Sequence, residues 1–158
     1  MEFKIDNHQE EYLNSINFME NRVNEIIKGL SNDLIWFVNY PSIYTFGPQT
    51  IESDLKIKDL FPVYETSRGG KLTYHGPGQR TVYLMIDLNK RTKDIKKFVR
   101  KIELVILKTL SFYNIEGELN NDHHGVFVQK NMRAHKIASI GLKFKKWTSF
   151  HGFSINVR

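Results

Sequence analysis

Two long segments of the sequence carry apolar residues at intervals of three or four positions, the spacing of an amphipathic helix. They run from Gln9 to Leu30 and from Lys93 to Phe112. The apolar positions are Leu13, Ile16, Met19, Val23, Ile26, Ile27 and Leu30 in the first, and Ile95, Phe98, Val99, Ile102, Val105, Ile106 and Leu110 in the second. Because this spacing gathers apolar side chains on one face, we expect both helices to pack against a sheet.

Shorter runs of apolar, aromatic and β-branched residues lie between turn residues and are predicted to be strands. They are Asp33–Asn39, Ile43–Phe46, Val63–Thr66, Thr81–Leu88, Gly125–Val128, Lys136–Phe144 and Thr148–Val157. The order of a helix, strands, a second helix and further strands predicts an α+β fold, a mixed or antiparallel β-sheet packed with helices. No repeat, linker or low-complexity stretch interrupts the 158 residues, so we expect a single domain, residues 1–158.

The composition is that of a folded protein, with 41% hydrophobic and 13% aromatic residues. The lack of cysteine excludes disulfides and thiolate zinc sites among these residues. No apolar run is long enough to cross a membrane and the N-terminus lacks a signal-peptide pattern, so a cytoplasmic location is expected. The net charge of +6 favours anionic partners. The basic residues are scattered, however, and the aromatic residues follow core periodicity, so neither nucleic-acid nor membrane binding is predicted.

The segment Arg68–Gln79 reads Arg-Gly-Gly-Lys-Leu-Thr-Tyr-His-Gly-Pro-Gly-Gln and concentrates the candidate chemistry of the sequence. Its glycines let the backbone approach a ligand closely, and N–H groups left free by such turns can bind an anion or a carbonyl oxygen. The residues alone leave open a plainer interpretation, two tight turns around a hairpin strand. The glycine spacing is neither that of a Rossmann fold nor that of a P-loop, so it does not predict nucleotide binding.

Over its whole length, Arg68–Gln79 resembles the signature of the lipoyl(octanoyl) transferases, a family within the biotin and lipoate ligase superfamily. Further segments that resemble the family are Tyr40–Gly47, Gly125–Val128, Lys136–Gly141 and Ser149–Val157. Tyr40 stands where the family usually has histidine. The likeness runs in order from about Asn39 to Val157.

The resemblance implies the fold of the biotin and lipoate protein ligase catalytic domains. It also implies transfer of an octanoyl or lipoyl group to protein lysines, the first step of protein lipoylation. The implied donor is octanoyl-acyl carrier protein. The implied acceptors are the lipoyl domains of 2-oxoacid dehydrogenases and the glycine cleavage H protein. Neither a cofactor nor a metal is implied.

Carried over by motif, the catalytic lysine is Lys136, which in the family lowers the pKa of an acyl-carrying cysteine. The implied acyl-binding residues are Arg68, Gly69, Gly70, Lys71, Leu72, Thr73, Tyr74 and His75, then Ser139, Ile140 and Gly141, and finally Gly152, Phe153 and Ser154. We expect these stretches and Lys136 to converge on one pocket. Taken alone, Lys136 has a plainer interpretation as a surface lysine.

In the family, the cysteine belongs to a segment beyond the Asn-Val that corresponds to Asn156-Val157. The sequence contains no cysteine and its last residue is Arg158, so this nucleophile has no counterpart here. We therefore expect an open pocket, a partly exposed Lys136 and no acyl-thioester intermediate.

Other functions stay open on the sequence alone. One is an ATP-dependent lipoate or biotin type of ligase that uses only the lysine. Another is a truncated, non-catalytic domain that binds acyl groups or carrier protein. The cluster Asp122-His123-His124 could suggest a metal, but a polar loop is the simpler interpretation, and no metal site is predicted.

Overall fold

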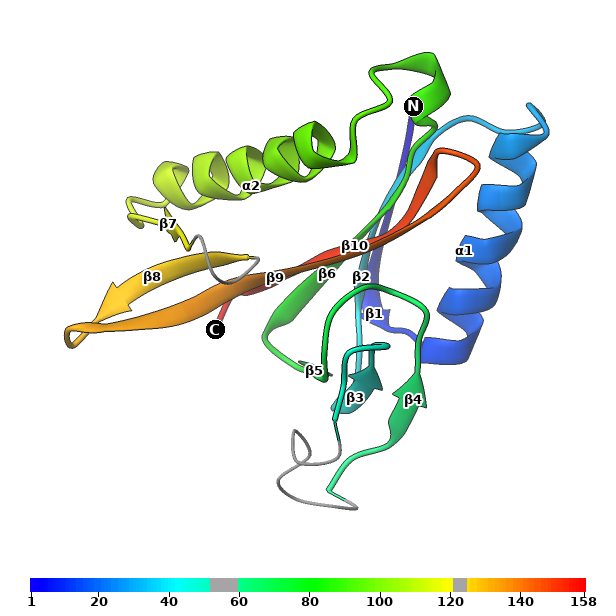
Figure 1. Ribbon diagram of the computed structural model, residues 1–158. Coiled ribbons are helices and arrows are strands. Elements are labelled where there is room, and N and C mark those ends of the chain that lie inside the picture. The colour runs from blue at the N-terminus through cyan, green and yellow to red at the C-terminus, as the bar shows by residue number, and fades with distance from the viewer. Residues whose placement is uncertain (52–59, 121–124) are drawn as a thin grey trace.

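The computed structural model describes residues 1–51, 60–120 and 125–158, and Figure 1 shows how their elements are arranged. Among these residues are two α-helices, α1 (Tyr12–Ile27) and α2 (Ile95–Phe112), and one short 3-10 helix, η2 (Leu88–Lys90). The strands are β1 (Glu2–Gln9), β2 (Leu34–Asn39), β3 (Ile43–Phe46), β4 (Val63–Glu65), β5 (Thr73–His75), β6 (Gln79–Met85), β7 (Glu118–Leu119), β8 (Val126–Lys130), β9 (Arg133–Lys145) and β10 (Thr148–Asn156).

The strands form two sheets. A seven-stranded sheet has the order β1-β2-β6-β10-β9-β8-β7, and a three-stranded sheet has the order β4-β3-β5. β1 pairs with β2 and β3 pairs with β4 in parallel, whereas the other strand pairs are antiparallel. The predicted α+β fold with a mixed sheet is therefore confirmed, although the sequence did not indicate that three strands would separate into a second sheet.

The central strands of the large sheet bury side chains on both faces. In β2, the side chains of Leu34, Trp36 and Val38 face one way and those of Ile35 and Phe37 the other, because direction alternates along a strand. The first group packs with α1, and the second belongs to the core under α2. Figure 1 shows the two helices on opposite sides of the sheet, so the molecule has three layers.

Both predicted helices are confirmed, but the buried stripe of α1 differs from the predicted apolar positions. The side chains that α1 buries are Tyr12, Ser15, Met19, Val23 and Ile26. Leu13 lies outside this stripe and is exposed, and Leu30 follows the end of the helix. At the start of α2, the Asp94 side chain accepts the Lys97 N–H at 2.9 Å, which caps the helix.

The hydrophobic pattern does not predict β1 or β7, the two edge strands of the large sheet. β1 is mostly polar, and its two apolar residues, Phe3 and Ile5, are exposed. β7 is only two residues long. An edge strand pairs on one side and buries little apolar surface, so a polar or very short one leaves no hydrophobic signal.

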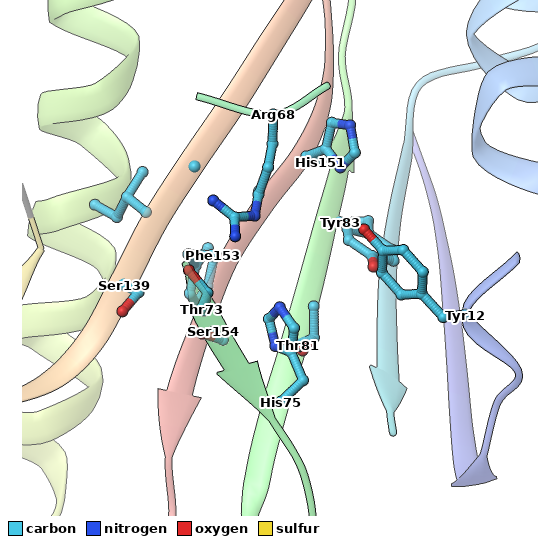
Figure 2. A pocket seen from close by; sticks show the side chains of 13 residues that line it. Tyr12, Arg68, Thr73, His75, Thr81, Tyr83, Ser139, His151, Phe153 and Ser154 are labelled. Carbon is cyan, nitrogen blue, oxygen red and sulfur yellow. Dashed lines mark hydrogen bonds between the residues drawn. The ribbon is translucent and has the colours of Figure 1, made fainter. Parts of the chain in front are cut away.

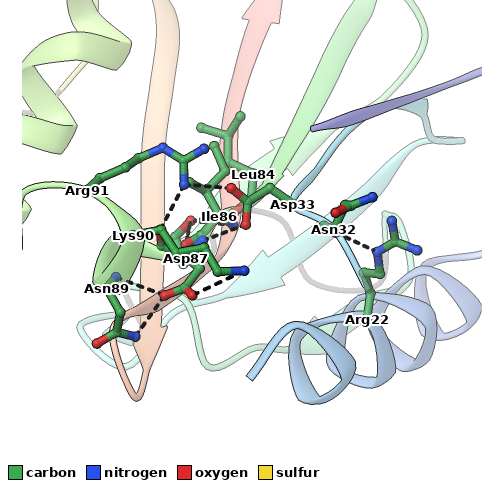
Figure 3. Close-up of polar contacts among 10 residues, drawn as sticks. Arg22, Asn32, Asp33, Leu84, Ile86, Asp87, Asn89, Lys90 and Arg91 are labelled. Carbon is green, nitrogen blue, oxygen red and sulfur yellow. Dashed lines mark hydrogen bonds and ion pairs between the residues drawn. The ribbon is translucent and has the colours of Figure 1, made fainter. Parts of the chain in front are cut away.

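The predicted strand Thr81–Leu88 ends early, because Leu88 belongs to η2 and not to β6. The Asp87 side chain accepts the Asn89 N–H at 2.8 Å and caps η2. Figure 3 shows the surrounding network. Arg91 Nη1 lies 2.6 Å from Asp33 Oδ2, and Asp33 Oδ1 accepts the Asp87 N–H at 2.9 Å. The buried carboxylate of Asp33 thus fastens η2 and the end of β6 to the start of β2.

Neither helix in the described part of the chain is long and apolar enough to cross a membrane. The histidine cluster Asp122-His123-His124, considered above as a source of metal ligands, lies outside the described residues.

Candidate functional site

A small cavity lies where the loop before β5 crosses the α1-facing side of the large sheet. Its volume is about 40 Å³, and Figure 2 shows the thirteen residues that line it. They are Tyr12, Arg68, Thr73, His75, Thr81, Tyr83, Ser139, Ile140, Gly141, His151, Gly152, Phe153 and Ser154. The cavity therefore joins residues of α1, the Arg68 loop, β5, β6, β9 and β10.

Small residues form the floor of this cavity because of the register of three neighbouring strands. Thr81 of β6 is opposite Ser154 of β10, which is in turn opposite Ser139 of β9. The adjacent row on the same face consists of Tyr83, Gly152 and Gly141. Paired residues, and residues two apart along a strand, share one face of a sheet. Three hydroxyl groups and two glycines therefore lie close together, which gives a ligand both hydrogen-bond partners and space.

Gly141 lets the Arg68 loop sit directly on β9. A Cβ atom at this position would lie 3.0 Å from the Gly69 carbonyl oxygen and 3.1 Å from Arg68 Cδ, closer than side chains normally pack. The loop and the strand are joined there by a hydrogen bond from the Gly69 N–H to the Leu142 carbonyl at 3.1 Å. One wall of the cavity thus depends on the absence of a side chain at position 141.

Arg68 brings a buried positive charge to the cavity. Its side chain is only 8% exposed, and its guanidinium donates to the carbonyls of Thr45, Gly69 and Lys71 at 2.9 to 3.0 Å. Burial lowers the pKa of this group, and no carboxylate of the described residues pairs with it. A buried cation held by neutral groups attracts a carbonyl oxygen or an oxyanion. Arg68 therefore both shapes the loop and gives the cavity a positive potential.

Two neutral histidines face this charge. Burial lowers the pKa of His75 to about 4, and Arg68 adds to the effect. Burial, Arg68, Lys143 and His75 together lower the pKa of His151 to about 3. In Figure 2 the guanidinium of Arg68 and the ring of His75 point toward each other from opposite ends of the cavity. Near neutral pH the only positive charge on the cavity wall is therefore that of Arg68 among the described lining residues.

Tyrosine hydroxyls close the side of the cavity next to α1. The hydroxyl groups of Tyr40 and Tyr83 lie 2.8 Å apart in the core, and the Tyr12 ring packs edge-on against the Tyr40 ring at 5.6 Å. Burial raises the pKa of all three phenols. They consequently stay neutral and can donate hydrogen bonds. Tyr40, which takes the place of a histidine in the family pattern, is part of this buried cluster and does not line the cavity.

Lys136 does not line the cavity, but a β-bulge turns it to the same face of the sheet. Val126 is opposite Ala138, while Phe127 is opposite Lys136, so Ile137 is an extra residue in β9. Ile137 and Ala138 both pack in the core under α2. Lys136 therefore points the other way, where its Nζ lies 5.2 Å from the centre of the Phe127 ring. Its side chain is exposed, and partial burial lowers the pKa of its amine.

Most of the residues expected to converge on one pocket do line the cavity. The structure brings together Arg68, Thr73, His75, Ser139, Ile140, Gly141, Gly152, Phe153 and Ser154. The expected residues that lie outside its lining are Gly69, Gly70, Lys71, Leu72, Tyr74 and Lys136. Tyr74 points away, since its hydroxyl lies 2.9 Å from Ser42 Oγ and its ring packs with Tyr44 and Phe61.

Four lining residues were not among the expected ones: Tyr12, Thr81, Tyr83 and His151. Tyr12 and Tyr83 have the spacing of core residues, and their hydroxyl groups carry no signal in the sequence. His151 belongs to a segment that matches the family, and it has a positive φ of 61°, which is unusual for a residue other than glycine. Its position directly before Gly152, one of the expected acyl-binding residues, was the sequence signal that could have identified it.

Potential metal-ligating side chains come together elsewhere, on β1 and at the residue that follows it. The ligand atoms of Asp6, His8 and Glu10 lie within 4.8 Å of one another. Asp6 already pairs with Lys4 and accepts the Trp36 Nε1–H at 2.6 Å, and His8 Nε2 lies 2.6 Å from Glu10 Oε1. These mutual contacts account for the cluster without an ion.

The sequence is also similar to those of known proteins. Residues 11–158 match the family model described as the lipoyl protein ligase A/B catalytic domain. The chain is 42% identical over 166 aligned residues to a protein of Bartonella tribocorum named octanoyltransferase, an alignment that covers 99% of this chain and 68% of that protein.

Solved structures share the fold at lower sequence identity. P. falciparum LipL1 in complex with lipoate has a TM-score of 0.69 at 19% identity, and the match covers 98% of this chain and 47% of that one. A bipartite lipoate protein ligase from Thermoplasma acidophilum has a TM-score of 0.67 at 14% identity, covering 99% of this chain and 62% of that one. The chain thus spans about half to two thirds of the length of these structures.

Proposed function

Because the chain belongs to the lipoyl protein ligase A/B catalytic domain family, we propose that it transfers octanoyl groups to protein lysines in protein lipoylation. The donor is octanoyl-acyl carrier protein, and the acceptor is a lysine of a lipoyl domain, such as those of 2-oxoacid dehydrogenases or the glycine cleavage H protein. Residues 1–158 act as one catalytic domain in the cytoplasm. The net charge of +6 would attract acidic protein partners of this kind.

The main support for this proposal is the arrangement of hydroxyl groups and glycines on the cavity floor beside Arg68. The reacting part of an acyl thioester is a neutral carbonyl on which negative charge develops during attack. A buried cation and three hydroxyl groups suit that carbonyl, while two glycines leave room next to it. Ionised groups that would repel a developing negative charge are missing from the described lining residues.

The acyl-binding residues in this proposal are those carried over by motif. They are Arg68, Gly69, Gly70, Lys71, Leu72, Thr73, Tyr74, His75, Ser139, Ile140, Gly141, Gly152, Phe153 and Ser154. Lys136 acts from the neighbouring part of β9, on the face to which the bulge directs it. An ammonium there stabilises negative charge on a sulfur or an oxygen close to the cavity.

The size of the cavity requires a movement when the acyl group binds. Its volume of about 40 Å³ holds roughly one water molecule, far less than an octanoyl chain needs. The Arg68 loop contacts β9 through the hydrogen bond from the Gly69 N–H to the Leu142 carbonyl at 3.1 Å. We expect the loop to separate from β9 along this contact.

A transfer assay tests the proposal. The chain is incubated with octanoyl-acyl carrier protein and a lipoyl domain, and the intact mass of the lipoyl domain is followed without ATP. We expect octanoylation that disappears when the acceptor lysine of the lipoyl domain is replaced. Ser139→Phe, which fills the cavity, should lower the rate at least ~10²-fold. Ser111→Phe, at the exposed end of α2, should leave it unchanged.

The same assay separates the alternatives. Modification of the lipoyl domain only with free octanoate and ATP would identify a ligase and contradict the transfer from carrier protein. Retention of the octanoyl carrier protein with no modification under either condition would identify a binding domain without catalysis.

A further inference from the structure

A chain of side-chain amides links the backbone of Lys136 to the ring of His75. Asn156 Nδ2 donates to the Lys136 carbonyl at 3.4 Å, and Gln79 Nε2 donates to Asn156 Oδ1 at 3.0 Å. Gln79 Oε1 then lies 2.7 Å from His75 Nδ1. Gln79 and Asn156 both belong to segments that match the family, yet neither is among the expected acyl-binding residues.

Two backbone carbonyls determine which atom is the donor and which the acceptor in each of these hydrogen bonds. The carbonyl oxygens of Lys136 and Tyr74 can only accept hydrogen bonds. Gln79 Nε2 must therefore face the Tyr74 carbonyl, 3.3 Å away, and Asn156 Nδ2 must face the Lys136 carbonyl. Both amides then present their oxygens in the opposite direction. It follows that Gln79 Oε1 is the atom that faces His75.

An amide oxygen next to His75 determines the tautomer of the ring. Oε1 accepts and cannot donate, so the proton of the neutral imidazole must be on Nδ1. Thr81 Oγ1, 3.4 Å from the same nitrogen, is compatible with this assignment. Nε2 then carries a lone pair, and no described residue forms a hydrogen bond with it. Because His75 lines the cavity and burial keeps it neutral, Nε2 is an available acceptor beside the acyl site.

We propose that Gln79 and Asn156 are positioning residues that hold His75 as the Nδ1–H tautomer, so that Nε2 accepts the proton of the attacking amine. This inference rests on the proposed octanoyl transfer. The amide chain begins at the carbonyl of Lys136, so it also ties the orientation of His75 to the part of β9 that carries the lysine.

The proposed step conserves atoms and charge. The nitrogen of the neutral acceptor lysine attacks the thioester carbonyl, the N–C bond forms, and the C–S bond breaks. Nε2 takes the proton that the nitrogen loses and returns it to the departing sulfur. The products are an amide and a thiol, and no further reactant is needed.

The tautomer can be measured without turnover. Long-range ¹H–¹⁵N correlation spectra of the ¹⁵N-histidine-labelled chain at pH 7.5 distinguish protonated from unprotonated ring nitrogens, and His75→Gln assigns the signals. We expect Nδ1 of His75 to be protonated and Nε2 unprotonated. Gln79→Leu should shift the ring toward the Nε2–H form, and Gln79→Glu, which keeps an acceptor, should restore Nδ1–H. Gln129→Leu is the matched control, since Gln129 bonds to Glu118 on the exposed edge of the sheet.

Two results would overturn the positioning role. One is an Nε2–H tautomer in the unmodified chain. The other is a folded Gln79→Leu variant, with backbone amide shifts otherwise unchanged, that keeps Nδ1–H. Asn156→Leu provides a second variant in case Gln79→Leu does not fold, and it should weaken the tautomer preference.

Kinetics of the transfer test the proton relay itself. Gln79→Leu should lower kcat about 10-fold or more with less than about a 3-fold change in KM for the lipoyl domain, and Gln79→Glu should recover most of the loss. An unchanged kcat in a variant with the altered tautomer would refute the relay. If the unmodified chain transfers nothing, the proposed function and the relay both fail, while the spectra still decide whether Gln79 positions His75.

Discussion

Burial sets the charge of the titratable side chains around the cavity. Arg68 keeps its charge without a carboxylate partner among the described residues, whereas His75 and His151, with pKa values of about 4 and about 3, are neutral near pH 7. This combination concentrates positive potential at one point and leaves neutral acceptors next to it. The chemistry proposed here needs both features, since a charged histidine could not accept a proton.

The neutral histidines make the stability of the fold dependent on pH. In the unfolded chain a histidine binds a proton near pH 6.5, whereas His75 and His151 resist protonation down to about pH 4 and 3 in the fold. The unfolded state therefore gains protons first, and stability is lost as the pH falls below 6.5. We expect the free energy of unfolding to drop by roughly 4 kcal/mol between pH 7.5 and 5 from these two groups. Urea unfolding at the two pH values measures this.

A variant isolates the contribution of one ring. His151→Asn should remove about half of the pH dependence, because the amide does not titrate. His8→Asn, at an exposed position on β1, is the control and should leave the dependence unchanged. A pH dependence of the same size in all three proteins would show that buried histidines are not its source.

Lys136 is expected to contribute more to octanoyl transfer than Lys130, the other lysine compared in the β8–β9 hairpin. Its amine lies on the cavity face of the sheet, whereas Lys130 is at the exposed end of β8. Lys136→Ala should lower kcat/KM for octanoyl transfer by ~10² to 10³-fold, and Lys130→Ala should change it less than about twofold. Steady-state kinetics of both variants test this. Equal losses would mean that Lys136 acts as an ordinary basic residue.

The cavity residues that lie within family motifs could be predicted from the sequence. Those whose spacing is typical of hydrophobic core residues could not. Gly141 and Ser154 were found because they lie within motifs. Tyr83 was missed because an aromatic residue in an apolar strand indicates packing, and only the register with Gly152 places its hydroxyl beside the cavity. The direction of Lys136 could not be predicted either, since it depends on a bulge that hydrophobic alternation does not mark.

The elements of the fold are held together by buried polar contacts as well as by the two hydrophobic cores. Arg91 is the central residue of one such contact, where it pairs with Asp33 at 2.6 Å and donates to the Asp87 carbonyl at 2.8 Å. Asp33 is 7% exposed, so its carboxylate has little access to water. This contact holds η2, which leads into α2, against the start of β2.

Removal of Arg91 should therefore destabilise the fold. Arg91→Ala leaves the buried carboxylate of Asp33 unpaired, and we expect a loss of roughly 2 to 4 kcal/mol in the free energy of unfolding. Arg100→Ala removes the exposed pair with Glu103 at 3.3 Å and should cost less than about 0.5 kcal/mol. Chemical denaturation of the two variants gives the comparison. Similar midpoints for both would show that the Asp33 contact adds nothing to stability.

Hydrophobic periodicity predicted both long helices and the buried strands, because those elements cover or form the two cores. It did not predict β1, whose polar residues need no buried face at the edge of the sheet. Nor did it separate β3, β4 and β5 into their own sheet, since strand pairing depends on residues far apart in the sequence. That second sheet matters for the site, because it carries the Arg68 loop onto β9.

The molecule as a whole has a second and much larger hollow, on the side of the sheet that α2 covers. This α2 groove has a volume of about 920 Å³ and is lined mainly by apolar side chains, including Phe37, Val82, Val105, Ile106 and Ile155. Val105 is 56% exposed. An exposed apolar surface of this kind favours association with other apolar molecules and limits solubility.

The α2 groove should bind the fluorescent probe 1-anilinonaphthalene-8-sulfonate in the native state. Val105→Asp puts a charge in the groove and should lower the fluorescence several-fold. Leu104→Asp adds the same charge at a position of similar exposure outside the groove and should leave the fluorescence unchanged. Titration of the folded proteins with the probe measures this. Equal fluorescence from the two variants would place the bound probe elsewhere.

The contrast between the two hollows gives the most direct test of the proposed site. Volume and apolar character favour the α2 groove for an acyl chain, whereas the hydroxyl groups, the glycines and Arg68 favour the small cavity. Backbone amide spectra of the ¹⁵N-labelled chain, titrated with octanoyl pantetheine, decide between them. The proposed site predicts the largest shift changes at Gly69, Ser139 and Gly152, with small changes at Val105. The largest changes at Val105 and its neighbours on α2, with Gly69 and Ser139 unaffected, would contradict the assignment of the cavity as the acyl site.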